Sequence, residues 1–206
     1  MMKAQPKDSY HHGDLRNTLI SIATQLLAQH GVAGLSLRAV AKEAGVSHAA
    51  PYRHFRDKTD LLESIAMSGY SRLTDVCQKA VKNHPDNPQH QLFDAGMGYL
   101  RLVMDQPEIA HLMFSGMLSQ ENCGEGLKQS GSIAVQSLAQ IIENGKQLGL
   151  YTENKTEDLT LTALACVHGI AMMILGGLIK RPESKTQLQV LGERIYNTLL
   201  TGLLKR

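Results

Sequence analysis

SLRAVAKEAGVSHAAPYRHF, residues 36–55, contains two short segments of helical periodicity separated by a glycine turn. Ser36 can cap the first helix, and Gly45 can adopt the positive φ that ends it. Ser47 is expected to cap the next helix, which should run to Phe55. Two short helices joined by a turn of three or four residues form a helix-turn-helix, so we predict this motif here.

Small and apolar residues in this stretch meet the packing needs of the motif. Ala41 is small at the position where the two helices cross, and Val46 can fill the inside of the corner. Pro51 lacks an N–H near the end of the first turn of the second helix. We therefore expect that helix to start late or irregularly.

Polar and cationic side chains gather around the second helix, whose N-terminal end would enter the major groove of DNA. Ser47, His48 and Tyr52 offer hydroxyl and imidazole groups there. Arg38, on the preceding helix, can reach a guanine edge or a phosphate. Lys58 lies at the start of the following helix, where free backbone N–H groups favour a phosphate. A plain corner of two helices with solvated charges is the alternative interpretation.

Charge is distributed unevenly along the 206 residues. Residues 1–58 hold eight Lys and Arg against four Asp and Glu, whereas the remainder holds thirteen against fifteen. A basic N-terminal part suits a polyanionic partner such as nucleic acid. On charge alone, a solvated basic surface without such a partner is equally consistent.

Composition indicates an intracellular globular protein. Hydrophobic residues make up 43% of the chain, enough for a sizeable core. Cys77, Cys123 and Cys166 are far apart and odd in number, which argues against a disulfide framework and for a reducing compartment. The N-terminus shows no apolar secretion segment. We expect a cytoplasmic location.

The whole chain is predicted to be all-α, with about nine helices and no alternating strand pattern. Glycine, proline and loop-type residues separate the helical segments. The expected helices cover residues 14–30, 36–44, 47–55, 57–83, 92–106, 107–118, 127–148, 158–179 and 187–204. Asp57 should cap the fourth of them.

The run GVAGLSLRAVAKEAGVSHAAPYRHFRDKTDLLESIA, residues 31–66, resembles the DNA-binding domain of the tetracycline-repressor (TetR) family. The preceding YHHGDLR and the first helix fit the same pattern. The resemblance implies a three-helix helix-turn-helix domain over residues 1–58 and a helical ligand-binding and dimerisation domain over residues 59–206. It implies a homodimer formed by the last two helices. This dimer would repress transcription at a palindromic operator in double-stranded DNA and leave it when a small-molecule effector binds, without any cofactor.

The resemblance also implies a set of DNA contacts, transferred position by position. These fall on Arg38, Ser47, His48, Ala49, Ala50, Tyr52, His54 and Lys58. Tyr52, His54 and Lys58 would anchor phosphates. Arg38, His48 and Ala50 would face bases, and alanines read only shape or a thymine methyl group. Base hydrogen bonds would therefore be few.

Soft and aromatic side chains are frequent in the second domain, which suits an adaptable ligand cavity. The residues expected to line it are Met97, Tyr99, Met104, His111, Phe114, Met117, His168 and Met172. Ordinary core packing is the simpler explanation for any single methionine among them. His168 can equally be a hydrogen-bonded core histidine.

Metal and enzyme motifs are absent from the sequence. His11 and His12 are adjacent, and His84 and His90 lie in or beside a loop, but none has the spacing of a metal site with a carboxylate. No nucleophile, phosphate-binding or catalytic carboxylate motif is present. We expect no metal site and no enzymatic activity, with an enzyme of unrecognised type as the alternative.

Residues 159–179 form a long apolar segment that allows two interpretations. Its length approaches the ~20 residues of a membrane-spanning helix, so a membrane-tethered regulator is one alternative. A helix that is apolar all round can also lie at the centre of a dimer. Small residues would allow close approach there, and apolar residues of the last helix would complete a four-helix bundle. These residues are Ala163, Gly169, Gly176, Gly177, Ile195, Leu199 and Leu203. We favour the dimer and expect no membrane span.

Overall fold

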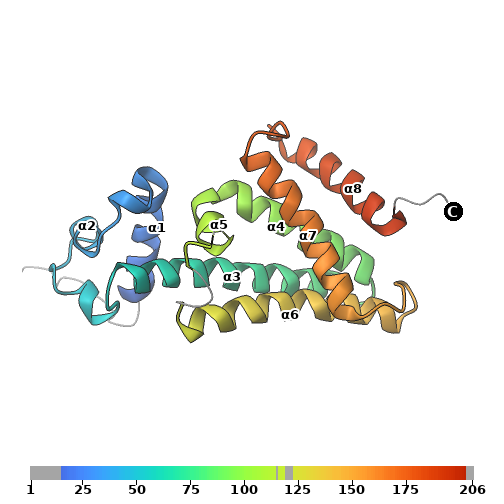
Figure 1. The fold of residues 1–206 in the computed structure, drawn as a ribbon, viewed down its shortest axis with the longest axis horizontal. Coiled ribbons are helices and arrows are strands. Elements are labelled where there is room, and N and C mark those ends of the chain that lie inside the picture. The colour runs from blue at the N-terminus through green and yellow to red at the C-terminus, as the bar shows by residue number, and fades with distance from the viewer. Residues whose placement is uncertain (1–14, 115, 119–122, 203–206) are drawn as a thin grey trace, which may run out of the picture. The chain divides into compact units, whose positions relative to one another are not determined.

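The computed structural model describes residues 15–114, 116–118 and 123–202. Within these ranges every regular element is helical, which confirms the predicted all-α class (Figure 1). The elements are α1 (Leu15–Gly34), α2 (Leu37–Glu43), the 3₁₀ helix η1 (Pro51–Arg53), α3 (Lys58–Asn83), α4 (Pro88–Asp105), α5 (Pro107–Phe114), α6 (Glu125–Gln147), α7 (Thr156–Leu175) and α8 (Lys185–Thr201). The chain divides into two compact units, Met1–Ile65 and Ala66–Arg206. The domain boundary expected after Lys58 stays a prediction.

The first unit has a small apolar core. Leu19, Ala23 and Leu27 lie one helical turn apart on α1 and are completely or almost completely buried, as expected for one face of an amphipathic helix. They share the core of this unit with residues of α2, of the segment after η1 and of the first turns of α3, namely Leu37, Val40, Ala41, Phe55, Leu61, Leu62 and Ile65. Gly31 has a φ of 63°, so α1 is kinked at the residue where the sequence predicted its end.

The third helix predicted over residues 47–55 is wrong in length and in its cap. Only Pro51–Arg53 is helical, as a single 3₁₀ turn, and no side chain caps it. The N–H of Ala50 bonds to the backbone carbonyl of Ser47 at 2.9 Å. Pro51 explains the difference, because it is buried and has no N–H to continue a ladder of α-helical hydrogen bonds.

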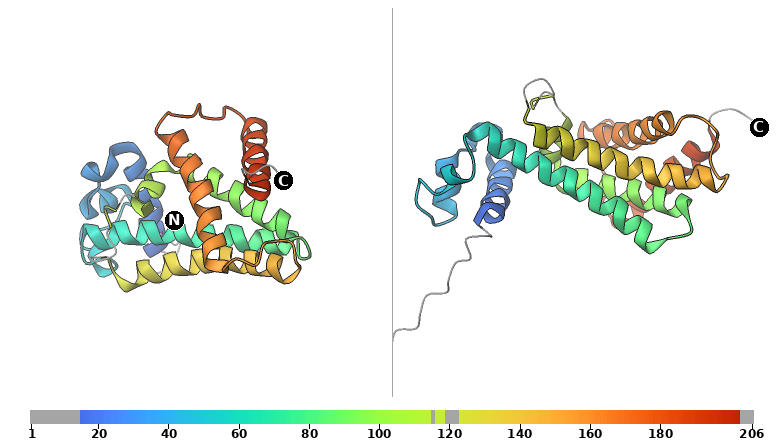
Figure 2. Two further views of the ribbon diagram at one scale, coloured as in Figure 1. Left: turned by 45° about the vertical axis from the view of Figure 1, so that its right-hand side comes forward. Right: turned by 90° about the horizontal axis from the view of Figure 1, so that it is seen from below.

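The second unit is built around α4. This helix packs against α5, α6, α7 and α8, and α6 also packs against α7. The part of α3 that belongs to this unit lies beside α6 in both views of Figure 2. Gly126 and Gly131 of α6 face Met67 and Tyr70 of α3, so backbone and side chains approach closely there. The resulting core has two clusters, one near Met97 and one near Ile141.

The apolar helix α7 is the one described helix that is long and apolar enough to cross a membrane. Much of its apolar surface is exposed in the single chain, with Leu161 66% exposed and Met173 37% exposed. A single helix of this kind is weak evidence for a membrane span, because core helices of other proteins meet the same criterion. Part of the apolar surface of α7 therefore lies open in the single chain.

Candidate functional site

The corner between α2 and η1 is fixed by local hydrogen bonds. The Ser36 hydroxyl accepts the N–H of Ala39 at 3.1 Å and caps α2, as predicted. Gly45 has a φ of +66°, and its N–H bonds to the carbonyl of Lys42. The N–H of Val46 then bonds back to the carbonyl of Ala41, which is fully buried. These bonds set the direction in which the chain leaves α2.

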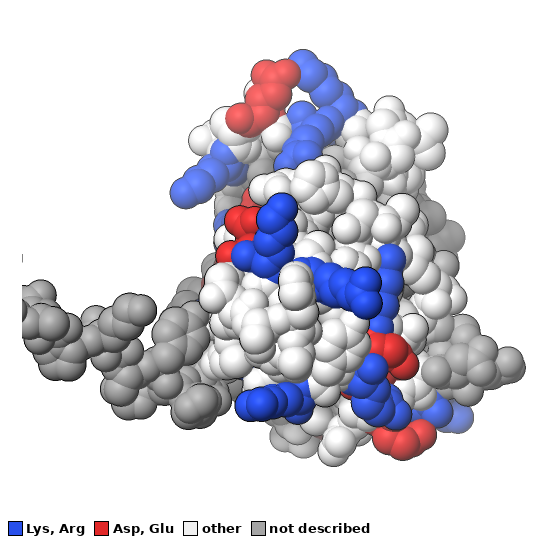
Figure 3. All heavy atoms as spheres, turned by 90° about the vertical axis from the view of Figure 1, so that its left-hand side faces the viewer, with Lys and Arg blue, Asp and Glu red and all other residues white. Residues whose placement is uncertain are grey.

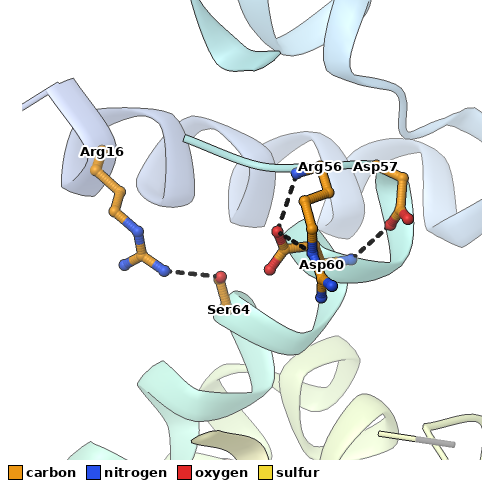
Figure 4. A network of polar contacts seen from close by, with 5 residues as sticks. All are labelled: Arg16, Arg56, Asp57, Asp60 and Ser64. Atoms are coloured by element: carbon orange, nitrogen blue, oxygen red, sulfur yellow. Dashed lines mark hydrogen bonds and ion pairs between the residues drawn. The ribbon is translucent and has the colours of Figure 1, made fainter. Parts of the chain in front are cut away.

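The start of α3 is fixed by two carboxylates, those of Asp57 and Asp60 (Figure 4). Asp57 Oδ1 accepts the N–H of Asp60 at 2.9 Å, which confirms the predicted cap. Asp60 Oδ2 in turn accepts the N–H of Arg56 at 2.9 Å and forms an ion pair with the Arg56 side chain. The first bond satisfies a backbone donor that the helix start leaves unpaired, and the second holds the residue before the cap. They order the segment that carries Lys58.

Arg16 of α1 supports this arrangement from the neighbouring helix. Its guanidinium donates to Ser64 Oγ at 3.0 Å, as Figure 4 shows. The same group lies 5.4 Å from the centroid of the Phe55 ring, within the range of a cation–π interaction. Phe55 is only 1% exposed. Arg16 therefore joins α1 to α3 and holds the end of the corner in place.

The predicted DNA-contacting side chains lie on and around this corner. Arg38, Ser47, His48, Ala49 and Tyr52 are exposed, whereas Ala50, His54 and Lys58 are half-buried. Within the described chain, the polar groups of these residues form no ion pair and no side-chain hydrogen bond, so they are available to a ligand. The face shown in Figure 3, which includes the side of α1 and α2, carries more Lys and Arg than Asp and Glu. Their contacts with DNA stay a prediction.

The second unit contains an apolar cavity of about 110 Å³. It lies among five helices, α3, α4, α6, α7 and α8, and no charged residue lines it. The lining residues are Tyr70, Leu73, Val76, Cys77, Leu92, Phe93, Ala95, Gly96, Met97, Tyr99, Leu100, Ala134, Val135, Leu138, Ala163, Leu164, Cys166, Val167, Ile170, Gly192, Ile195, Tyr196 and Leu199. A largely apolar pocket between helices is the usual form of a small-molecule site.

Three tyrosines line the cavity, and the protein itself engages each of their hydroxyls. Tyr70 donates to the carbonyl of Met113 at 3.0 Å, and Tyr196 donates to the carbonyl of Gln89 at 2.5 Å. The Tyr99 hydroxyl lies 2.7 Å from Nδ1 of His168. Burial raises the pKa of Tyr99, so its hydroxyl stays protonated and can donate to this nitrogen.

His168 and Phe114 form an aromatic cluster behind Tyr99. The Phe114 ring centroid lies 4.8 Å from that of His168 and 6.0 Å from that of Tyr99. Desolvation lowers the pKa of His168, which favours the neutral ring. His168 thus has the hydrogen-bonded environment of a core histidine, one of the two roles expected for it.

The residues expected to line a ligand cavity are therefore divided. Met97 and Tyr99 line it, and Phe114 and His168 contact Tyr99 from behind. Met104 is buried in the core cluster that also contains Met97, and Met172 packs against that cluster, but neither lines the cavity. His111 and Met117 are exposed. Sequence reasoning missed most of the lining, since ordinary apolar residues at helical spacing carry no signal that separates a cavity wall from a core.

No group of three or more His, Cys, Asp or Glu within the described ranges could hold a metal ion. His84 Nε2 lies 3.1 Å from Asp94 Oδ2, an isolated pair, and His11 and His12 lie outside the described residues. The cysteines of the described chain are free. Burial raises the pKa of the Cys77 thiol to about 11, so this group stays uncharged at neutral pH.

Comparisons with known proteins agree with the helix-turn-helix. The model of the family described as "Bacterial regulatory proteins, tetR family" matches residues 19–65. The HTH-type transcriptional regulator AcrR of Shigella flexneri is 33% identical over 75 residues, which are 36% of this chain and 35% of that protein. The match thus spans about a third of the length of AcrR. The HTH-type transcriptional repressor BepR of Brucella suis biovar 1 is 27% identical over 200 residues, 92% of each chain.

Solved structures match nearly the whole chain. A protein of unknown function from Rhodococcus sp. RHA1 has 30% identity and a TM-score of 0.82, over 97% of this chain and 100% of that one. The transcriptional regulator FadR from Bacillus subtilis, solved in complex with stearoyl-CoA, has 18% identity and a TM-score of 0.72, over 91% of this chain and 99% of that one. These relatives are regulators or share their fold, which agrees with the expectation that the chain is not an enzyme. The chain belongs to the tetR family of bacterial regulatory proteins.

Proposed function

We propose that this protein is a homodimeric transcriptional repressor that holds a palindromic operator and releases it when a small molecule occupies the cavity. The observation that carries the proposal is the corner of α2 and η1, which is rigidly bonded from within and leaves polar groups unpaired on its exposed side. AcrR and BepR are named as a transcriptional regulator and a repressor, which supports the same function.

Binding to DNA would combine contacts with bases and contacts with phosphates. Arg38, His48 and Ala50 would face base edges in the major groove, where short side chains allow close approach. Tyr52, His54 and Lys58 would position the protein on the phosphates, as would the hydroxyl of Ser47 and the backbone beside Ala49. Phosphate contacts fix orientation, and base contacts give specificity.

The dimer would form through α7 and α8, with a stripe of small and apolar residues at its centre. Leu161, Ala165, Gly169 and Met173 recur every fourth residue along α7, so they share one face of the helix. Leu161 is 66% exposed, and a Cβ added at Gly169 would meet nothing within 4 Å. A second copy of this face would cover it, and a two-fold axis would make the contact self-complementary.

Release would depend on α3, which contributes to both units. Its residues Lys58–Ile65 belong to the first unit, and Tyr70 and Cys77 line the cavity of the second. A small molecule that fits one position of α3 better than another would shift the population of dimers away from the DNA-binding separation of about 34–36 Å between recognition elements. The FadR complex with stearoyl-CoA shows that a protein of this fold holds a small ligand.

Selection of binding sites from a random DNA library tests the DNA-binding part of the proposal. We expect enrichment of an inverted repeat whose half-sites lie one helical turn apart. Affinity for this DNA should fall linearly with salt on a log–log plot, and Lys58→Ala should flatten that slope. Lys82→Ala, at the other end of α3, is the control and should leave the slope unchanged. A library that yields no common sequence would contradict sequence-specific binding.

The apolar surface of α7 also fits the alternative of a membrane tether, so the proposed cytoplasmic location needs its own test. Cell fractionation separates the two. A dimeric protein recovered without detergent supports the repressor as proposed. Recovery only in the detergent-extracted membrane fraction would favour the tethered regulator.

A further inference from the structure

The cavity in the second unit offers a ligand no charged partner. None of its lining residues is Lys, Arg, Asp, Glu or His. An ion placed there would lose its hydration without gaining a counter-charge, which is strongly unfavourable. The cavity therefore selects against carboxylates, phosphates and ammonium groups.

The cavity also offers few free hydrogen-bonding groups. The hydroxyls of Tyr70, Tyr99 and Tyr196 are each engaged by a partner from the protein. The remaining heteroatoms of the lining side chains are the sulfur atoms of Met97, Cys77 and Cys166, which are weak donors or acceptors. A ligand with several polar groups would leave them unpaired on entering.

The volume limits the size of the ligand. An apolar cavity of about 150 Å³ in another protein stays dry and binds benzene. The cavity of about 110 Å³ found here is of similar scale. From the lining, the engaged hydroxyls and this volume, we infer that the effector is a compact, uncharged, apolar molecule about the size of one hydrocarbon ring. That the bound molecule is the effector rests on the proposed function. The binding specificity of the cavity does not depend on it.

Gly96 of α4 provides a way to fill the cavity. It lines the cavity, and a Cβ added there would meet no atom within 4 Å. By contrast, a Cβ at Gly192, which also lines the cavity, would collide with the side chain of Met97. Because glycine is a poor residue inside a helix, replacement of Gly96 should not weaken α4. A side chain at position 96 would occupy the space of the ligand.

Calorimetric titration of the full-length protein with toluene tests the inference, with benzoate and stearoyl-CoA as charged comparisons. We expect toluene to bind, and both charged compounds to bind at least tenfold more weakly. Gly96→Leu should lower the affinity for toluene at least tenfold, and Gly96→Ala should lower it less. Gly131→Ala is the control, since Gly131 does not line the cavity and the added Cβ would make only ordinary contact with the Tyr70 ring.

Three outcomes would overturn the inference: no binding of toluene, binding of benzoate or stearoyl-CoA as tight as that of toluene, or a folded Gly96→Leu with wild-type affinity. If Gly96→Leu does not fold, the inference is overturned when Gly96→Ala binds toluene with wild-type affinity and the charged compounds bind as tightly as toluene. Toluene binding with the expected specificity but without any change in operator affinity would support the cavity inference and contradict the proposed release.

Discussion

The helix-turn-helix corner and the cavity are constructed in opposite ways. The corner comes from one continuous stretch, in which caps at Ser36 and Asp57 and the turn at Gly45 act on near neighbours. The cavity takes its lining from five helices between Tyr70 and Leu199. The corner leaves polar groups unpaired at the surface, whereas the cavity has even its tyrosine hydroxyls satisfied. Contact with DNA is therefore decided locally, and ligand specificity is decided by tertiary packing.

The exposed face of α7 belongs neither to the corner nor to the cavity lining. A substitution on this face is expected to have the largest effect on operator binding. Gly169→Arg would place two like charges, one from each protomer, in the proposed dimer interface. Burying an unpaired charge costs several kcal/mol per ion, so dimer affinity should fall by roughly 10³-fold or more at ~1.4 kcal/mol per decade. Sedimentation velocity should show monomers, and operator binding should be lost with them.

Gln129→Arg on α6 is the matched control for this variant, because Gln129 is exposed and lies on another helix. It should remain dimeric. A dimeric Gly169→Arg protein would place the interface elsewhere and would separate DNA binding from α7.

Within the corner, Phe55→Ala is expected to have the largest effect on stability. Phe55 is 1% exposed and lies under the Arg16 guanidinium. Truncation of a buried phenylalanine costs about 3–5 kcal/mol through lost burial and the cavity left behind. Urea unfolding should show this loss, and Phe55→Leu should recover most of it because volume is largely kept. Equal stability of Phe55→Ala and the wild type would mean that the corner is not held from this side.

Tyr52 lies three residues before Phe55, and Tyr52→Ala should have the opposite effect: it should weaken DNA binding and leave stability nearly unchanged. Tyr52 is 53% exposed and its hydroxyl has no partner in the described chain, so the free energy of unfolding should hardly change. A hydrogen bond to a charged phosphate is worth about 1.5–3 kcal/mol. Two copies per dimer imply a loss of operator affinity of order 10² or more, measurable by fluorescence anisotropy.

Tyr52→Phe separates the hydroxyl from the ring and should lose most of the same affinity. Normal operator binding by Tyr52→Ala would show that the exposed side of the corner does not face DNA. Unfolding of the variant would show that Tyr52 has a structural role.

These contrasts also explain how much of the molecule the sequence could predict. Signals that act between near neighbours were readable: the caps at Ser36 and Asp57 and the positive φ of Gly31 and Gly45 are all present. The extent of the third helix was not, because a missing N–H at Pro51 reduced it to one 3₁₀ turn. The sequence predicted a late or irregular start for this helix, but it did not predict that the helix would be as short as one turn.

The cavity could not be predicted from the sequence, for a physical reason. Val76, Leu138 and Ile195 have the periodicity of core residues, and only the spacing between packed helices decides whether such residues touch each other or enclose space. The methionines and aromatic residues singled out by composition lie on both sides of that division. Met97 lines the cavity, and Met104 fills the core.

The smallest expected effect is on the pH dependence of stability, and it arises from His168 behind the cavity. Desolvation lowers the pKa of His168 below its ordinary value of 6.5. The unfolded chain therefore binds a proton more readily than the folded protein does. The stability that the neutral ring contributes is fully present above about pH 6.5 and declines as pH falls toward and through the lower folded pKa. Protonation of Nδ1 would also remove the acceptor of the Tyr99 hydroxyl.

His168→Gln should therefore reduce the loss of stability between pH 7.5 and pH 5, by at most about 1 kcal/mol, the net worth of one hydrogen bond. Unfolding in urea at a series of pH values measures this difference between the variant and the wild type. His111→Gln is the control for the substitution itself, because His111 is exposed and takes no part in the Tyr99–His168 hydrogen bond. If His168→Gln follows the same pH dependence as the wild type, the Tyr99–His168 hydrogen bond does not stabilise the cavity wall.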